Sequence, residues 1–262
     1  MSRGRLPSLG IVATFKNYAS YAPGCLDSLL QSSAKPLQVI AVDDGSADDT
    51  LAVLSEISGR HPGWTTVSLA GRGLSIARNI GLVRLETDYV WFIDGDDEAR
   101  PGAVDYLLEV CKKNQYPDAV FFSRQEVGSQ SGRLGDVTPD IQIDPLTLPV
   151  VGPKRGHSYL SRMRRAANWN VSACSFIVKR ELIQSEGLWF LDGLLYEDNL
   201  FTAQLLLTNP PVQSISYPAL LRRTHEGSLT ATLTWNERAH HLARAFLALR
   251  KWANRRPRKL PK

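Results

Sequence analysis

The sequence is poor in cysteine and has no long apolar run. Its three cysteines, Cys25, Cys111 and Cys174, show none of the spacings of metal ligands and cannot all pair with one another. This content favours a reducing compartment over a secreted, disulfide-stabilised domain. No stretch approaches the roughly 20 apolar residues that cross a bilayer, and the apolar run near the start is too short for a signal peptide. We therefore expect a cytoplasmic protein.

Positive charge is scarce outside the C-terminal segment. The net charge of the 262-residue chain is +5, yet residues 235–262 alone hold nine Lys/Arg and one acid, Glu237. The rest of the chain is therefore mildly acidic. Hydrophobic residues make up 43% and charged residues 22% of the chain, as is usual for a globular protein. The length suits one large α/β domain.

Short apolar runs alternate with segments of helical spacing over the first half of the chain. Continuous apolar runs suit strands that are buried on both faces, and the alternation predicts a parallel, doubly wound sheet. No GxGxxG motif follows the first predicted strand, which disfavours a dinucleotide-binding dehydrogenase. The predicted strands are 9–15, 37–42, 65–69, 89–93 and 119–123, and the predicted helices are 22–32, 48 or 49 to 57, 75–84 and 101–113.

The second half is less regular. Residues 128–156 are rich in Gly, Pro, Asp and Ser and predict a long excursion or lid. A short strand at 173–178, a helix at 198–207 and a strand at 212–217 are expected after it.

Polar side chains follow three of the predicted strands. Lys16-Asn17, Asp43-Asp44 and Asp94–Asp97 each stand just past a strand. Because ligands of such sheets bind at the carboxyl ends of strands, we expect these clusters to line one crevice. The closely spaced carboxylates of Asp94–Asp97 suit Mg²⁺ or Mn²⁺, which prefer oxygen ligands and share them with phosphates. A solvated acidic turn is the alternative for this run taken alone.

Two segments carry candidate nucleotide contacts. In VDDGSADDT (42–50), Asp43 and Asp44 are placed to accept hydrogen bonds from a base or a ribose, whereas the other residues suit a strand–turn–helix connection. In GLSIARNIG (73–81), Ser75 is a fair helix N-cap, and Arg78 either meets a nucleotide or forms an ion pair with a nearby Asp.

A third segment, LLYEDNLF (194–201), holds Glu197 and Asp198 between hydrophobic residues at the start of a predicted helix. Acids at this position commonly complement the helix dipole. An acid pair in an apolar setting also holds a general base near its working proton.

Taken together, these motifs resemble glycosyltransferase family 2, the inverting transferases of the GT-A fold. The resemblance covers about the first 115 residues well and the later segments more loosely. Ala13 stands where the family usually has Pro, and Phe15-Lys16 replace the usual end of the first motif. In chain order, the matching segments are IVATFKN (11–17), VDDGSADDT (42–50), GLSIARNIG (73–81), DGDD (94–97), the acid pair Glu197-Asp198 and RRTHEGSLT (222–230).

The resemblance implies a GT-A fold, with a Rossmann-like, mostly parallel sheet flanked by helices. It also implies transfer of a hexose or N-acetylhexosamine from a nucleotide-diphosphate sugar, above all a UDP-sugar, to a glycan or lipid-linked acceptor in cell-surface polysaccharide or lipopolysaccharide synthesis. On this basis residues 1–125 form the nucleotide-sugar-binding half, 126–234 the acceptor-binding and catalytic-base half, and 235–262 a basic amphipathic tail.

The same resemblance implies roles for individual residues. Asp198 is the implied catalytic base beside Glu197, and Asp96 with His225 are the implied ligands of Mn²⁺ or Mg²⁺. The residues implied in donor binding are Thr14, Phe15, Asp43, Asp44, Arg78, Asp94 and Gly95.

The basic tail has Leu242, Phe246, Leu249 and Ala253 at helical spacing. Either this apolar face packs on the domain, or the helix lies on the anionic inner face of the cell membrane and makes the protein peripheral. Two other functions stay open. Asp94 behind an apolar strand is also a feature of haloacid-dehalogenase-like phosphatases. The tail alone suggests nucleic-acid binding, but the acidic body leads us to expect no nucleic-acid partner.

Overall fold

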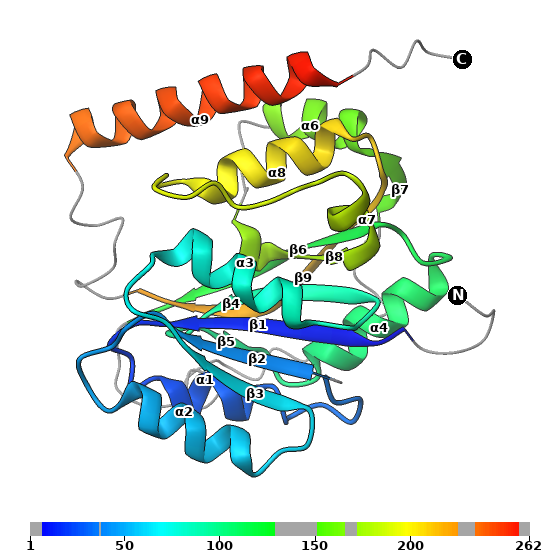
Figure 1. Cartoon of the computed structure of the whole chain (residues 1–262). Coiled ribbons are helices and arrows are strands. Elements are labelled where there is room, and N and C mark those ends of the chain that lie inside the picture. The colour runs from blue at the N-terminus through cyan, green and yellow to red at the C-terminus, as the bar shows by residue number, and fades with distance from the viewer. Residues whose placement is uncertain (1–6, 37, 129–150, 166–171, 225–233, 257–262) are drawn as a thin grey trace.

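The computed structural model describes residues 7–36, 38–128, 151–165, 172–224 and 234–256. Its first half is a regular alternation of strands and helices around a parallel sheet (Figure 1). Strands β2 and β4 flank β1, and β3 lies outside β2, all in parallel. The elements are β1 (Leu9–Phe15), α1 (Ala22–Ser28), β2 (Gln38–Asp43), α2 (Thr50–Gly59), β3 (Trp64–Ser68), α3 (Leu74–Arg84) and β4 (Tyr89–Asp94).

The second half extends the same sheet with mixed pairing. Strand β8 pairs antiparallel with β4 and β6, and β6 runs parallel to β9. The edge strands β5 and β7 both pair antiparallel with β9. The elements are β5 (Glu98–Ala99), α4 (Ala103–Lys113), β6 (Ala119–Val127), β7 (Val151–Arg155), α6 (Gly156–Arg165), the 3-10 helix η1 (Ala173–Ser175), β8 (Phe176–Lys179), α7 (Arg180–Ser185), α8 (Glu197–Leu207), β9 (Pro211–Arg223) and α9 (Trp235–Arg255).

The sheet separates two apolar layers. All seven residues of β1 are buried, because helices cover both faces of the central strands. Ile11 belongs to the core that includes Leu26 of α1 and Leu54 of α2, whereas its neighbour Val12 belongs to the core that includes Leu82 of α3 and other residues on α8. In Figure 1, α1, α2 and α4 accordingly lie below the sheet, α3 and α8 lie above it, and α9 crosses outside α8.

The predicted fold class is confirmed, and the differences from the predicted elements are local. The helix expected over 22–32 ends at Ser28, because the chain continues to Gln31 with i→i−3 bonds in place of α-helical ones. The segment expected to be a lid at 128–156 contains β7 from Val151 to Arg155, and residues 129–150 lie outside the described residues. The strand expected at 212–217 is the longer β9.

Candidate active site

The carboxyl ends of the central strands bring three of the predicted polar clusters together. The strand register places Phe15 beside Asp43 and Thr14 beside Asp94. The amide of Gly95 donates to the carbonyl of Thr14 at 2.9 Å. Residues from three separate motifs therefore meet at one edge of the sheet, as the sequence predicted.

Asp43 and Asp44 organise the two loops at this edge. The Asp43 carboxylate accepts from the hydroxyl and the amide of Ser46. The Asp44 carboxylate accepts from the amides of Arg72 and Gly73, at 2.6 and 2.9 Å. Both aspartates are buried. They fix the conformation of these loops, and a base or ribose contact from either carboxylate stays a prediction.

Gly73 opens helix α3 in place of the N-cap expected at Ser75. Its φ of 91° lies in the left-handed region, where a side chain is strained. The Ser75 hydroxyl instead donates to the carbonyl of Leu191 at 2.9 Å. This bond helps to attach α3 to the segment that leads into α8.

The acidic loop after β4 is packed as tightly as a core segment. A side chain on Gly95 would overlap the ring of Phe15, since its Cβ would stand 2.2 Å from a ring carbon. Asp97 and Glu98 are buried, whereas Asp94 and Asp96 are partly exposed. Two of the four acids of the loop are therefore partly accessible to solvent at the strand ends.

Arg223, at the end of β9, holds this loop from the other side. Its amide donates to Asp97 at 3.0 Å, and its guanidinium donates to the Asp96 carbonyl at 3.2 Å and to Glu98 at 3.3 Å. The guanidinium also lies 4.9 Å from the ring centroid of Tyr21. The sequence placed Arg223 in the RRTHEGSLT segment but gave it no role.

Negative charge accumulates around the loop. Burial and the carboxylates of Asp96 and Asp94 raise the pKa of Asp97 well above its usual range. Burial also raises the pKa of the Tyr18 hydroxyl, and Asp96 raises it further by its charge and by a hydrogen bond. Sequence reasoning missed Tyr18, although it directly follows the polar pair Lys16-Asn17. The charge is of the kind that a bound cation would relieve.

The donor set for a metal ion is incomplete within the described residues. They contain no group of three or more His, Cys, Asp or Glu side chains that could hold an ion. Mg²⁺ is commonly held by one or two carboxylates with substrate phosphates supplying the other oxygens, and Asp96 fits that mode. The second implied ligand, His225, lies outside the described residues.

Arg78 connects the acidic loop to the predicted catalytic pair. Its guanidinium is buried and donates to Asp94 at 2.7 Å and to Glu197 at 2.5 Å. Burial alone lowers the pKa of Arg78, but the charges of Asp94 and Glu197 outweigh it and raise the pKa. Arg78 thus forms the ion pair with a nearby aspartate that the sequence left as an alternative to nucleotide binding.

Glu197 and Asp198 open helix α8 after a strained residue. Tyr196 has φ 64° and ψ 37°, a left-handed conformation that is uncommon for a large side chain. The Asp198 carboxylate accepts from the amide of Asn199 at 2.8 Å. Burial, followed by the charge of Glu197, raises the pKa of Asp198 to about 7. A carboxyl with this pKa is suited to exchange a proton near neutral pH.

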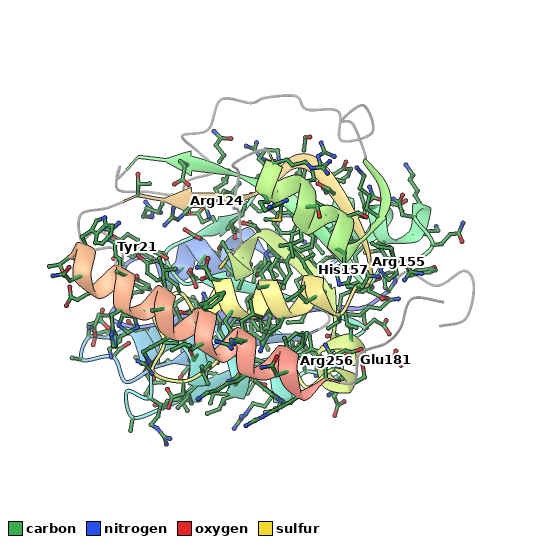
Figure 2. All side chains as sticks on the ribbon, turned by 90° about the horizontal axis from the view of Figure 1, so that it is seen from above. Tyr21, Arg124, Arg155, His157, Glu181 and Arg256 are labelled. Atoms are coloured by element: carbon green, nitrogen blue, oxygen red, sulfur yellow. The ribbon has the colours of Figure 1, made fainter. Side chains whose placement is uncertain are left out.

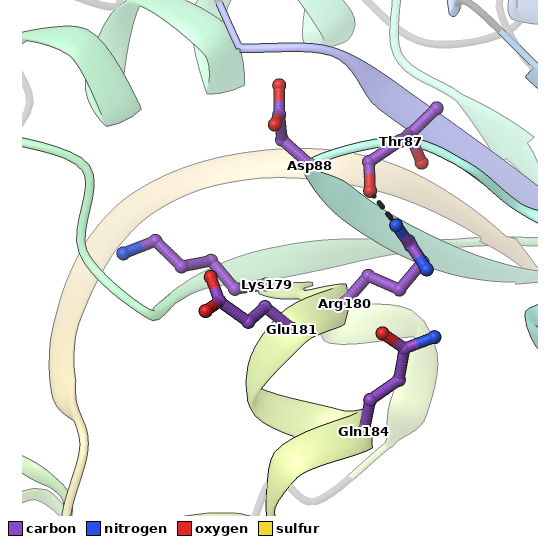
Figure 3. A pocket seen from close by; sticks show the side chains of 6 residues that line it. All are labelled: Thr87, Asp88, Lys179, Arg180, Glu181 and Gln184. Atoms are coloured by element: carbon purple, nitrogen blue, oxygen red, sulfur yellow. Dashed lines mark hydrogen bonds between the residues drawn. The ribbon is translucent and has the colours of Figure 1, made fainter. Parts of the chain in front are cut away.

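A cavity of about 250 Å³ lies at the opposite end of the sheet (Figure 3). Its lining includes Thr87 and Asp88, which precede β4, whereas the acidic loop follows that strand. The Arg180 guanidinium donates to the carbonyl of Thr87 at 2.9 Å, and Lys179 forms an ion pair with Asp118 at 2.7 Å. We place the active site at the carboxyl end, where the titratable groups of the motifs converge.

A family model described as glycosyl transferase family 2 matches residues 10–186, which includes β1 to β4 and the acidic loop. The chain belongs to glycosyl transferase family 2. This match gives no support to a haloacid-dehalogenase-like phosphatase or to a nucleic-acid-binding protein.

Two relatives of this family 2 chain are an uncharacterized glycosyltransferase and a teichoic acid polymerase. The uncharacterized glycosyltransferase EpsJ of Bacillus subtilis (strain 168) is 26% identical over 229 residues, which cover 86% of this chain and 63% of EpsJ. The teichoic acid poly(glycerol phosphate) polymerase of Staphylococcus epidermidis is 26% identical over 219 residues, which cover 82% of this chain and 28% of the polymerase. The chain therefore spans less than two thirds of the length of these relatives.

A solved structure of similar fold is that of S. aureus TarS 1-349 in complex with UDP-GlcNAc. It superposes with a TM-score of 0.70 at 20% identity and covers 87% of this chain and 61% of the TarS chain. The similarity supports the GT-A architecture that the motifs implied. Within the described ranges, none of the helices has the length and apolarity of a membrane-spanning segment.

Proposed function

We propose that this family 2 chain is an inverting, metal-dependent transferase that moves a hexose or N-acetylhexosamine from a nucleotide-diphosphate sugar to a hydroxyl of a glycan or lipid-linked acceptor. The observation that carries the proposal is the position of Asp198 beside Glu197, at the start of α8, where burial also raises the pKa of Asp198. Through Glu197 and Arg78 it is tied to Asp94 at the strand ends. The buried guanidinium of Arg78 thereby fixes the predicted base relative to the predicted donor loop.

A UDP-sugar is the donor that we put first. TarS, which has a similar fold, was crystallised with UDP-GlcNAc. Thr14 lies beside Asp94 and Phe15 beside Asp43 at the strand ends, and the Thr14 hydroxyl is buried with no hydrogen-bond partner among the described residues. A nucleotide in the crevice would supply a partner for it. The teichoic acid polymerase among the relatives favours an acceptor of the cell envelope.

The partly exposed Asp96 is the carboxylate that we assign to Mn²⁺ or Mg²⁺, with His225 as the second implied ligand. An ion held by Asp96 would neutralise negative charge on the diphosphate leaving group. Arg223 donates to the Asp96 carbonyl and so holds the backbone that carries this carboxylate.

Asp198 is the group that takes the proton of the acceptor hydroxyl. Glu197 is already bound by Arg78, which leaves Asp198 as the carboxylate of the pair to accept a proton. The oxygen that loses this proton attacks the anomeric carbon from the side opposite the diphosphate. A single displacement of this kind inverts the configuration.

A donor screen tests the proposal. The melting temperature of the full chain is measured with UDP, GDP and dTDP sugars, each with and without Mn²⁺. We expect one nucleotide class to raise it, and more so with Mn²⁺, because a ligand at about 100 times its Kd stabilises the fold by about 2.7 kcal/mol. If no donor raises the melting temperature under either condition, the proposal is wrong.

A further inference from the structure

Helices α6 and α9 form an outer layer with an excess of positive charge. Both pack on α8 (Figure 1), and in the view from above α8 lies between them (Figure 2). Helix α9 holds five Lys/Arg and a single acid, Glu237, and α6 holds three arginines and no acid. The arginines of α6, Arg162, Arg164 and Arg165, are exposed. Two segments far apart in the sequence thus build one basic face.

Helix α9 is fixed to the domain along one side. Ala245 is buried against Leu194 and Leu200, and Leu249 packs on the same cluster. The Arg244 guanidinium donates to the carbonyl of Gly193 at 2.8 Å. At the C-terminal end, Arg256 forms an ion pair with Glu186. The helix is part of the folded body, and its orientation on that body is set.

A second, apolar side of α9 is left uncovered. Trp235, Leu242 and Phe246 are 81%, 48% and 65% exposed. At 3.6 residues per turn these three lie in one stripe, about a quarter turn away from Ala245. Leu247, which is 52% exposed, adds a fourth apolar side chain to the outside of the helix. Exposed apolar residues are normally scattered singly over a protein surface, so this group of apolar side chains indicates a binding surface.

The combination of positive charge and apolar surface on this face determines which kind of partner fits it. At 3.6 residues per turn Arg250 borders the stripe and Lys251 borders Leu247. Both are exposed, and no ion pair engages either of them within the described residues. A second copy of this face would bring like charges together. A nucleic acid would match the charge but leave the leucine and phenylalanine in water. An anionic bilayer surface accommodates both, with apolar side chains at headgroup depth and cations over the phosphates.

We propose that the face formed by α6 and α9 binds an anionic lipid surface through the exposed stripe of Trp235, Leu242 and Phe246. The same helix contacts the segment before the catalytic pair, where His241 accepts from the amide of Leu195 at 3.2 Å. A lipid-linked acceptor would therefore reach Asp198 from the membrane on which the helix lies. That last step rests on the proposed function, whereas the lipid binding does not.

Sedimentation of the full chain with vesicles tests the proposal. We expect binding to vesicles of phosphatidylglycerol, little binding to vesicles of phosphatidylcholine, and weaker binding at high salt. The double variant Leu242→Ser/Phe246→Ser should lower the affinity about tenfold or more, because the buried apolar area is lost. Arg250→Glu/Lys251→Glu should lower it for phosphatidylglycerol. Val83→Ser is the matched control, since Val83 is 59% exposed on α3, and it should change nothing.

The outcomes separate the possibilities. Equal binding to both lipids, no binding to either, or an unchanged affinity of the Leu242/Phe246 variant would overturn the proposal. So would light scattering that shows a dimer of the unmodified chain and a monomer of this variant without lipid. Donor binding in solution is measured separately for the same variant. A variant that loses vesicle binding but keeps the donor response shows that the lipid proposal and the transferase proposal can be tested independently.

Discussion

At the scale of single residues, the neighbouring acids Glu197 and Asp198 have different surroundings and therefore different acid–base properties. Arg78 donates to Glu197, whereas the Asp198 carboxylate accepts from the amide of Asn199. The environment thereby separates a carboxylate compensated by a cation from a carboxyl whose pKa is raised to about 7. Such a separation within a pair of acids is a physical basis for assigning the base.

Replacing the predicted base tests this assignment. Asp198→Asn keeps the shape of the side chain and removes its capacity to accept a proton. We expect turnover to fall by about 10²–10⁴-fold while donor binding is unchanged. Steady-state kinetics and a donor titration measure the two quantities. The exposed Asp192→Asn, in the segment that leads into the same helix, is the control. Full turnover in Asp198→Asn would remove Asp198 from the mechanism.

The pH dependence of kcat/KM tests the same residue without a mutation. A general base works in its ionised form, and the Asp198 carboxyl ionises as the pH rises through about 7. The rate should therefore be low at pH 5, rise through neutrality and level off above it. A rate that already reaches its plateau at pH 5 contradicts the raised pKa.

Asp96 is the second residue whose role can be isolated. Asp96→Ala should abolish Mn²⁺-dependent binding of UDP. The only other partly exposed carboxylate of the loop is that of Asp94, and it is already paired with Arg78. Isothermal titration with UDP and Mn²⁺ measures the effect. Asp49→Ala removes an exposed acid from the neighbouring turn and should bind both normally. Normal binding by Asp96→Ala would exclude it as a metal ligand.

At the scale of elements, the local parts of the site were predictable and the long-range parts were not. Each strand–loop–helix motif carries its turn residues and its apolar run within a few positions, so the strand ends with Asp43 and Asp94 followed from the sequence. The pairing of Arg78 with Glu197 joins residues 119 apart, and no local pattern encodes it. Strand β5 has two residues and α7 has six, and elements this short carry too few residues to show a period.

Arg78 on α3 contacts residues of β4 and α8, so its replacement should lower the stability of the fold as well as change the site. Arg78→Met leaves Glu197 buried without its cation, and breaking a buried pair in this way costs about 3–5 kcal/mol. Urea unfolding measures the loss. Arg60→Met breaks the exposed pair with Glu56 on α2 and should cost less than about 1 kcal/mol. A similar effect of the two substitutions would mean that the network does not hold α3 to α8.

At the scale of the whole molecule, the acidic loop after β4 is held by the last strand of the sheet. Strand β9 pairs with β5, β6 and β7, and it carries Arg223 to a loop that precedes it by more than 120 residues in the chain. The family match ends at residue 186, before this strand begins. The sequence indicated an arginine-containing segment here, but its contact with Asp97 requires the whole sheet to be assembled.

Arg222 and Arg223 provide a matched pair for testing this dependence, because neighbouring residues of a strand point to opposite faces. Arg223→Met removes the guanidinium from the buried Glu98 and from the Asp96 carbonyl. We expect the free energy of unfolding to fall by about 3–5 kcal/mol and UDP affinity with Mn²⁺ to fall as well. Arg222→Met loses a half-exposed pair with Glu126 at 3.3 Å and a weaker attraction to Asp97 and Asp94, and should cost about 1 kcal/mol or less. If both variants bind UDP as the unmodified chain does, the acidic loop keeps its shape without the Arg223 guanidinium, and donor binding does not depend on that contact.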